Sequence, residues 1–328
     1  MKKIFLNSLL FSILLFASCK KDTNIFVPDP GQQLDSAWTN NVTTNSQVLI
    51  LSKNLEGALT AQNMNSATDT TVTTGTGLQI LLPASGLLLN GTAVSGGVKV
   101  EYVLLQKKGD FIRYGVPTST YANKYPLESG GALHIRLTSN GLPLTVATNR
   151  KIVIRYRDAE PKQGMSVFYG NTLTVTNSLL FDWTLATDNS TVKLWDSLNI
   201  SPAAKGYVLE TSRTGWVNVD RSLETTTVQP RIEVKAVLPD LFSNANTAVY
   251  MVFKNYRSVV QLSGNTTLRS FSYPNIPANQ DVQFVAISKV GSSYYLGVKD
   301  EKTAANMVSF IKPQLSSLDA INALLNGL

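Results

Sequence analysis

The sequence predicts a mainly all-β protein with two β-sandwich-like domains in tandem and a short C-terminal helix. Short runs of Val, Ile, Leu, Thr and Tyr recur from Gln47 onward, and Gly, Asn and Pro interrupt them, as in a chain of strands and turns. The 328 residues are 43% hydrophobic and 16% charged, which is typical of a globular chain long enough for about two domains. We place the domains at residues 46–175 and 176–328.

The N-terminus has the layout of a secretory signal peptide. Two lysines precede an apolar run that ends at Phe16, and this run is shorter than the roughly 20 residues that span a bilayer. The small residues Ala17 and Ser18 then precede Cys19, the single cysteine of the chain. These four residues resemble a lipobox, in which the thiol is lipidated and the cysteine becomes the mature N-terminus. We therefore predict a signal peptide at residues 1–18 and lipidation at Cys19, with an incidental cysteine as the alternative.

Lipidation at Cys19 implies an exported protein anchored to the outer membrane. Burial of an acyl chain contributes about 0.8 kcal/mol per CH₂, and two or more chains hold a protein stably on a membrane. The polar residues 19–45 contain prolines and are predicted to form a tether that follows the lipid. Lys21-Asp22 is similar to the signal that places some Bacteroidota lipoproteins on the cell surface, but it has only one acid, so the periplasmic face stays an alternative.

Two segments of the first domain alternate as strands do. The even-numbered residues of 98–103 are predicted to share one face, and the odd-numbered residues of 133–138 are predicted to form a buried face. Asn90-Gly91 and Asn140-Gly141 are turn signals, because both residue types tolerate positive φ. A further strand is predicted at residues 48–50.

Three motifs in residues 77–146 carry a family resemblance. They are a Pro-Ala-x-x-Leu entry at Pro83, a Gly-x-Val-x-Val strand at Gly96 and a Ser-Gly-Gly before a strand at Ser129. In this order the region resembles the ZU5-like β-sandwich and a group of Bacteroidota outer-membrane lipoproteins, which implies an interaction or scaffold module. Some relatives cleave themselves at a His-Phe-Ser site, but His134 is followed here by Ile and Arg, so self-cleavage is not expected.

Three tryptophans, Trp183, Trp195 and Trp216, form a candidate ligand platform. Tryptophan stacks on sugar rings, whereas filling a core or a domain junction is the structural alternative. Trp216 belongs to a Gly-Trp-Val-Asn-Val-Asp-Arg segment, which is similar to a recurring element of the same lipoprotein group. In that segment Asp220 and Arg221 are predicted to pair with neighbouring residues and fix a turn, as a structural ion pair or polar latch rather than in a catalytic role.

The composition argues against metal, cofactor and nucleic-acid chemistry. The chain has one histidine, and a lipidated Cys19 leaves no free cysteine, so no metal or cofactor is predicted. The formal net charge is +7, but no Lys/Arg cluster has interleaved aromatics, so nucleic acid is not a predicted partner. Glu101, Glu128, Asp110 and Asp182 are carboxylates that a glycoside hydrolase would need in pairs, and the sequence gives no separation between them.

The second domain is predicted to contain further strands and to end in a helix. The strands are expected at residues 232–237, 249–253, 259–262, 282–287, 294–298 and 308–311. The helix is predicted to be capped by Ser316 and to end at Gly327, with an apolar stripe formed by Leu318, Ile321, Leu324 and Leu325. We expect this stripe to dock on the β-sandwich.

The leading prediction is a non-enzymatic lipoprotein that acts as a scaffold or binding module at the bacterial cell envelope. Its predicted partners are the membrane, through the N-terminal lipid, and a protein or glycan that the sequence does not identify. Two alternatives stay open: a glycan-binding lipoprotein that uses the tryptophans, and a carbohydrate or peptidoglycan hydrolase. Exposed tryptophans would favour the glycan binder, buried tryptophans the scaffold, and facing carboxylates the hydrolase.

Overall fold

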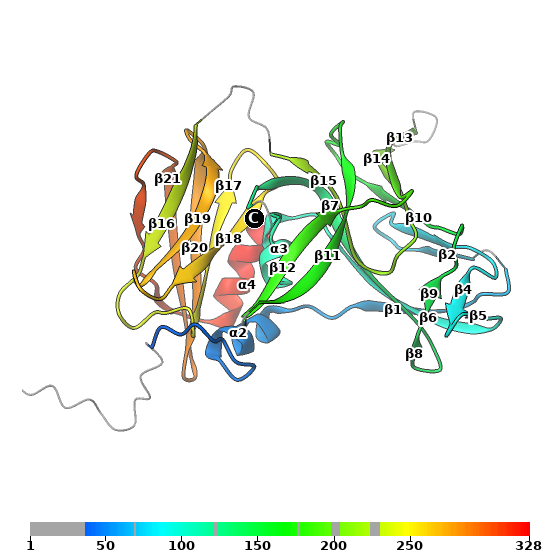
Figure 1. Cartoon of the computed structure of the whole chain (residues 1–328), viewed down its shortest axis with the longest axis horizontal. Coiled ribbons are helices and arrows are strands. Elements are labelled where there is room, and N and C mark those ends of the chain that lie inside the picture. Colours follow the sequence, from blue (N-terminus) through cyan, green and yellow to red (C-terminus); the bar gives the residue numbers. More distant parts are fainter. Residues whose placement is uncertain (1–36, 69, 121–123, 176–177, 198–203, 224–229) are drawn as a thin grey trace, which may run out of the picture. The chain divides into compact units, whose positions relative to one another are not determined.

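Antiparallel strands make up most of the protein in this computed structural model (Figure 1), with 53% of residues in strands and 9% in helices. The structure describes residues 37–68, 70–120, 124–175, 178–197, 204–223 and 230–328. The predictions of a mainly β fold and of a short C-terminal helix are confirmed. The predicted signal peptide at residues 1–18, Cys19 and the tether as far as residue 36 lie outside the described residues.

The first sheet combines strands from distant parts of the chain. In order, it contains β1 (Thr60–Asn65), β6 (Gly97–Leu105), β7 (Leu127–Ser139), β15 (Gly215–Ser222), β11 (Ser166–Val175) and β12 (Ser178–Leu185), with β8 (Leu142–Pro143) beside β7. β15, which follows residue 176 in the chain, pairs with β7 and β11, which precede it, so the first sheet contains strands from both sides of residue 176. The division into domains at residues 46–175 and 176–328 stays a prediction.

A five-stranded sheet shares a core with the first sheet. Its order is β13 (Thr191–Ser197), β14 (Ala204–Thr211), β10 (Ile152–Arg157), β3 (Gln79–Leu82) and β2 (Thr70–Thr73), while β5 (Thr92–Ala93), β4 (Leu87–Leu89) and β9 (Thr145–Val146) form a small third sheet. Val98, Val100 and Tyr102 of β6 pack with Ile80 and Ile154 of the five-stranded sheet in one buried cluster. The alternation predicted for residues 98–103 is therefore confirmed.

The two Asn-Gly dipeptides form the turns that the sequence predicts. Asn90 and Gly91 have φ of 49° and 85° and join β4 to β5, and Asn140 and Gly141 have φ of 49° and 79° and join β7 to β8. Positive φ at both central residues is the type I′ geometry, which matches the twist of a two-residue hairpin.

The C-terminal part forms an eight-stranded sheet that curls into a half-barrel. Its order is β22 (Val308–Phe310), β16 (Arg231–Val237), β19 (Ser270–Pro277), β18 (Val259–Asn265), β17 (Thr247–Phe253), β20 (Asp281–Val290), β21 (Ser293–Lys302) and β23 (Gln314–Ser316). β22 and β23 stand at opposite ends of this order, yet only residues 311–313 separate them in the chain. The two edges must therefore approach each other, and Ile311 between them is buried in the same core as Val234 and Phe284.

Three short helices lie between the β regions and fill a second apolar core, here called the helical core (Figure 1). They are α2 (Gln47–Leu55), α3 (Lys108–Arg113) and α4 (Leu318–Gly327). Each helix contributes a fully buried side chain, Leu51, Phe111 and Ile321 respectively. β17 is buried along its whole length, because alternate residues face the helical core and the core of the half-barrel. The predicted docking of the C-terminal apolar stripe is confirmed, since Ile321 and Leu325 belong to the helical core.

Two local predictions are wrong. The apolar run at residues 48–50, predicted as a strand, belongs to α2, because a short apolar run fits a buried helix face as well as a strand. The N-cap of α4 is Ser317 and not Ser316, which ends β23. The Ala320 amide donates a hydrogen bond of 3.1 Å to Ser317 Oγ, as in a standard N-cap.

Gly109 allows α3 and α4 to touch, and replacing it tests this contact. A β-carbon at Gly109 would overlap the carbonyl oxygen of Leu325, so Gly109→Ala is expected to lower the free energy of unfolding by about 1–3 kcal/mol. The control is Gly327→Ala in α4, where a β-carbon would meet no heavy atom within 4 Å and alanine is the better helix former. Urea unfolding followed by circular dichroism compares the two, and equal stability would contradict the close approach.

Candidate functional site

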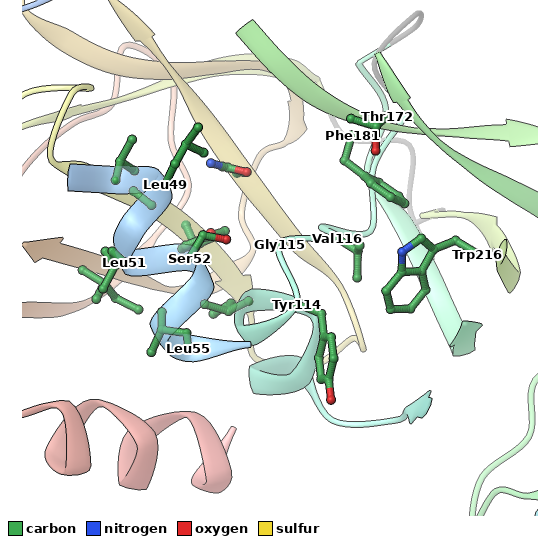
Figure 2. A pocket seen from close by; sticks show the side chains of 16 residues that line it. Leu49, Leu51, Ser52, Leu55, Tyr114, Gly115, Val116, Thr172, Phe181 and Trp216 are labelled. Carbon is green, nitrogen blue, oxygen red and sulfur yellow. The ribbon is translucent and has the colours of Figure 1, made fainter. Parts of the chain in front are cut away.

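A pocket of about 240 Å³ opens beside the helical core (Figure 2). Its lining comes from separate elements: Ser52 lies on α2, Tyr114 directly follows α3, Phe181 lies on β12, Trp216 on β15 and Tyr250 on β17. Most of the other lining side chains are apolar. A concave site with apolar walls and a few polar groups is the usual form of a ligand pocket, and we take it as the candidate functional site.

Strand register builds the aromatic wall of this pocket. His134, Trp216, Gly170 and Trp183 stand opposite one another on β7, β15, β11 and β12, so they lie on one face of the first sheet. Gly170 leaves room for the flanking rings, since a β-carbon there would lie 2.5 Å from Cζ of Phe181 and 2.9 Å from Cζ3 of Trp183. The ring centroid of Trp216 lies 4.9 Å from that of His134 and 6.5 Å from that of Trp183.

The structure separates the three tryptophans of the predicted platform. Trp183 is 1% exposed, and its Nε1 donates a hydrogen bond of 2.8 Å to the Pro117 carbonyl oxygen, which is a core role. Trp216 is half-buried and lines the pocket. Trp195 lies on β13 of the five-stranded sheet, half-buried, with the guanidinium carbon of Arg155 5.3 Å from its ring centroid.

Sequence reasoning missed several walls of the pocket. Residues 48–50 are predicted as a strand, so the helix α2 that supplies Ser52 is not expected from the sequence. Tyr250 lies in a strand that is apolar on both faces, so alternation gives no sign of which face it occupies. A signal for Phe181 is present in the sequence, because residues two apart on a strand share a face and Trp183 follows two positions later.

The pocket is electrically neutral. None of the described residues that line it is charged at neutral pH. Burial raises the pKa of Tyr250, which is 6% exposed, and burial also raises the pKa of Tyr114, with smaller contributions from two nearby carboxylates. Beside Trp216, burial and the charge of Arg136 lower the pKa of His134, which favours its neutral form. The pocket therefore suits an uncharged and largely apolar ligand.

The carboxylates considered for a hydrolase have structural partners. Arg136 and Lys99 donate hydrogen bonds to Glu101 and lower its pKa to about 2. Asp110 accepts a hydrogen bond from the backbone at the start of α3, and Asp182 accepts one from the neighbouring threonine. In the part of the chain that the structure describes, no three His, Cys, Asp or Glu side chains are grouped to hold a metal ion.

Asp220 and Arg221, the predicted polar latch, have different surroundings. Arg221 pairs with the fourth candidate carboxylate, Glu128, at 2.5 Å across β15 and β7. Asp220 is fully buried instead, with Asn218 donating a hydrogen bond of 2.6 Å to its Oδ2. Its Oδ1 has no hydrogen-bond partner among the described residues. Burial raises the pKa of the Asp220 carboxyl well above its usual range.

Comparison of the chain with protein-family models, curated proteins and solved structures finds no match. The resemblance of residues 77–146 to the ZU5-like β-sandwich, and of the N-terminus to lipoproteins, therefore stays a prediction. Over the described ranges, the structure contains no helix that is both long enough and apolar enough to span a bilayer.

The raised pKa of Asp220 predicts a pH-dependent stability. In the folded protein the Asp220 carboxyl holds its proton to a higher pH than in the unfolded chain, where its pKa is about 4. The free energy of unfolding of the wild type should therefore fall as the pH rises above about 4, by up to about 1.4 kcal/mol per pH unit. Asp220→Asn removes this loss, so its stability relative to the wild type should increase between pH 4 and pH 8. Asp240→Asn, at an exposed aspartate, is the control. Urea unfolding at each pH measures the difference, and parallel curves for wild type and Asp220→Asn would contradict it.

Proposed function

We propose that this chain is a non-catalytic lipoprotein, anchored to the outer membrane through Cys19, whose folded part binds an uncharged ligand or partner group in the pocket of Figure 2. The residues Phe16 to Cys19 support the anchor, and the neutral pocket supports binding rather than catalysis. We also propose a tandem of two β-sandwich-like domains, the first of them ZU5-like. The first domain is supported by two sheets that share the core around Ile154, and the second domain is supported by the half-barrel.

The lining of the pocket is the observation that carries this proposal. Acid–base and nucleophilic catalysis need an ionisable or activated group within hydrogen-bond reach of the substrate. The described lining residues offer hydroxyls and an amide but no charged group, while Trp216 and Phe181 offer large apolar surfaces. Such a site holds an apolar group by burial and orients it with one or two hydrogen bonds.

A glycan-binding role is the second candidate, and one arrangement favours it. Trp216 is half-buried at the pocket, and Thr172 and Gln261, which also line it, are exposed polar side chains. An indole face with hydroxyl and amide groups beside it suits a sugar ring. Binding to a glycan panel that Trp216→Ala loses and Trp195→Ala keeps would favour this candidate over an apolar ligand.

Filling the pocket tests the proposed site. Ser52→Phe places a ring in the pocket, so we expect at least about tenfold weaker binding of the neutral apolar dye N-phenyl-1-naphthylamine, followed by dye fluorescence. Lys53→Phe introduces the same ring at the next, exposed position of α2 and should keep the wild-type affinity. If both variants bind the dye as the wild type does, the pocket is not the binding site.

Removing the thiol tests the anchor. Cys19→Ala is expected to move the protein from the membrane fraction to the soluble fraction, because the acyl chains supply the membrane affinity. Cell fractionation with immunoblotting measures the distribution. Ser18→Ala keeps the thiol and should stay in the membrane fraction, whereas membrane retention of Cys19→Ala would refute the lipid anchor.

A further inference from the structure

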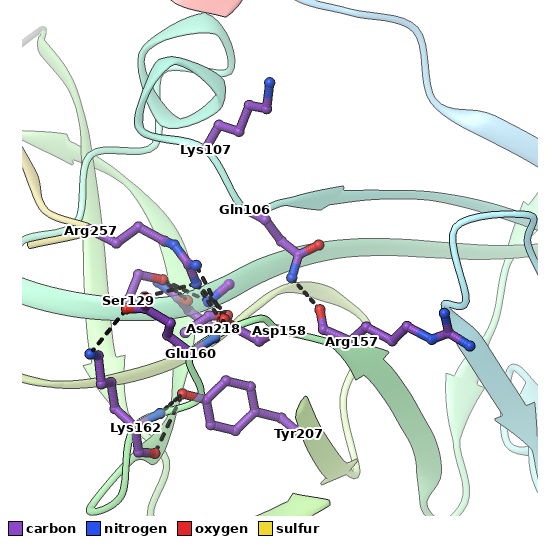
Figure 3. Close-up of polar contacts among 12 residues, drawn as sticks. Gln106, Lys107, Ser129, Arg157, Asp158, Glu160, Lys162, Tyr207, Asn218 and Arg257 are labelled. Atoms are coloured by element: carbon purple, nitrogen blue, oxygen red, sulfur yellow. Dashed lines mark hydrogen bonds and ion pairs between the residues drawn. The ribbon is translucent and has the colours of Figure 1, made fainter. Parts of the chain in front are cut away.

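A second pocket, of about 290 Å³, is lined by charged side chains from several separate segments. Figure 3 shows polar contacts among some of these side chains and their neighbours. Lys107 and Lys108 lie at the start of α3, residues 158–162 follow β10, and residues 254–257 connect β17 to β18. β7 adds Glu128. This charged pocket and the apolar pocket have no lining residue in common among the residues described.

Arg257 ties the segments around the charged pocket together. Its Nη1 donates to Asp158 Oδ2 at 2.6 Å, and it also donates to the carbonyl oxygens of Ser129 and Gly130. Its Nη2 donates to Asp158 Oδ1 at 3.4 Å. The Asp158 side chain is 1% exposed, so its charge is committed to Arg257. A guanidinium has five N–H donors, and these bonds leave the Nε donor of Arg257 available within the described structure.

Lys108 is one of two lysines of this pocket without a described counter-ion; the other, Lys107, is exposed and donates a hydrogen bond of 3.1 Å to the Asn326 carbonyl oxygen. The Nζ of Lys108 donates hydrogen bonds to the carbonyl oxygens of Phe253 at 2.8 Å and Lys254 at 3.1 Å, and no described carboxylate lies within 4.0 Å of it. An ammonium has three donors, so one stays available. Burial and the charge of Arg257 lower the pKa of Lys108, which means that this cation is partly desolvated and faces a second cation.

The acidic side chains of the pocket do not neutralise Lys108, because each is paired with another cation. The pairs are Glu128 with Arg221, Asp158 with Arg257, and the 81% exposed Glu160 with Lys162. Two cations from different segments, Lys108 and Arg257, therefore face a polar cavity whose described acidic side chains are already engaged.

We infer that this pocket binds a small oxyanion, either a phosphate or a carboxylate, between Lys108 and Arg257. A partly buried cation without a counter-charge is costly, and an oxyanion offsets that cost by accepting charge-assisted hydrogen bonds from both side chains. The volume of about 290 Å³ accommodates such a group. This site goes beyond the proposed function, which rests on the apolar pocket.

Isothermal titration calorimetry of the full chain with inorganic phosphate at constant ionic strength tests the inference. We expect saturable binding by the wild type. Lys108→Gln keeps a donor for the carbonyl oxygens but removes the charge, and should bind at least about tenfold more weakly, whereas Lys108→Arg should retain binding. Lys312→Gln, at an exposed lysine outside the pocket, is the matched control and should bind as the wild type does.

Parallel titrations identify the source of the oxyanion. Acetate tests a free carboxylate, and phosphatidylglycerol vesicles, compared with phosphatidylcholine vesicles, test a lipid phosphate. Saturable binding that depends on Lys108 in any arm supports the site. Binding that Lys108→Gln retains, or no saturable wild-type binding below about 10 mM in every arm, overturns it, and the wild-type titrations decide this even if a variant does not fold.

Discussion

The packing of the helical core is the interaction on which the rest of the structure depends. Side chains from both β regions, such as Trp183 on β12 and Val285 on β20, pack in it with Leu51, Phe111 and Ile321 from the three helices. Helices of ten residues or fewer are marginal in isolation, so burial of their apolar faces between the sheets stabilises them. The apolar pocket borders this core and shares lining residues with it, such as Leu51, Ile112 and Tyr250, so packing in the core holds that part of its walls.

The parts of the fold that the sequence predicts are those set by neighbouring residues. Asn90-Gly91 specifies its hairpin locally, and residues 98–103 alternate because one face of β6 is buried. The runs Val48–Ile50 and Val249–Met251 are alike in composition, yet the first is helical and the second is a strand. The first is half-buried and the second is buried on both faces, and only tertiary packing distinguishes such a helix face from a strand covered on both sides.

The site is less predictable than the fold because it depends on strand register. Trp216 and Trp183 come within 6.5 Å only because β11 lies between their strands and places Gly170 between the two rings. Trp195 and Trp216 are both predicted to belong to the platform, but Trp195 lies on an edge strand of another sheet. The sequence can thus identify aromatic residues as candidates for the site, whereas which of them lie together depends on the pairing of strands that are distant in the chain. The same holds for Asp158 and Arg257, which meet across distant segments of the chain.

α3 connects the two pockets. Lys107 and Lys108 at its start line the charged pocket, and Ile112 and Tyr114 to Val116 at its end line the apolar pocket. Gly109 lies so close to Leu325 that α3 and α4 pack with no room for a side chain between them at this point. Phe111, in the middle of α3, is fully buried. A binding site on such a fixed element loses little conformational freedom when a ligand binds. The same packing that makes a six-residue helix stable therefore also holds the groups of both pockets in place for binding.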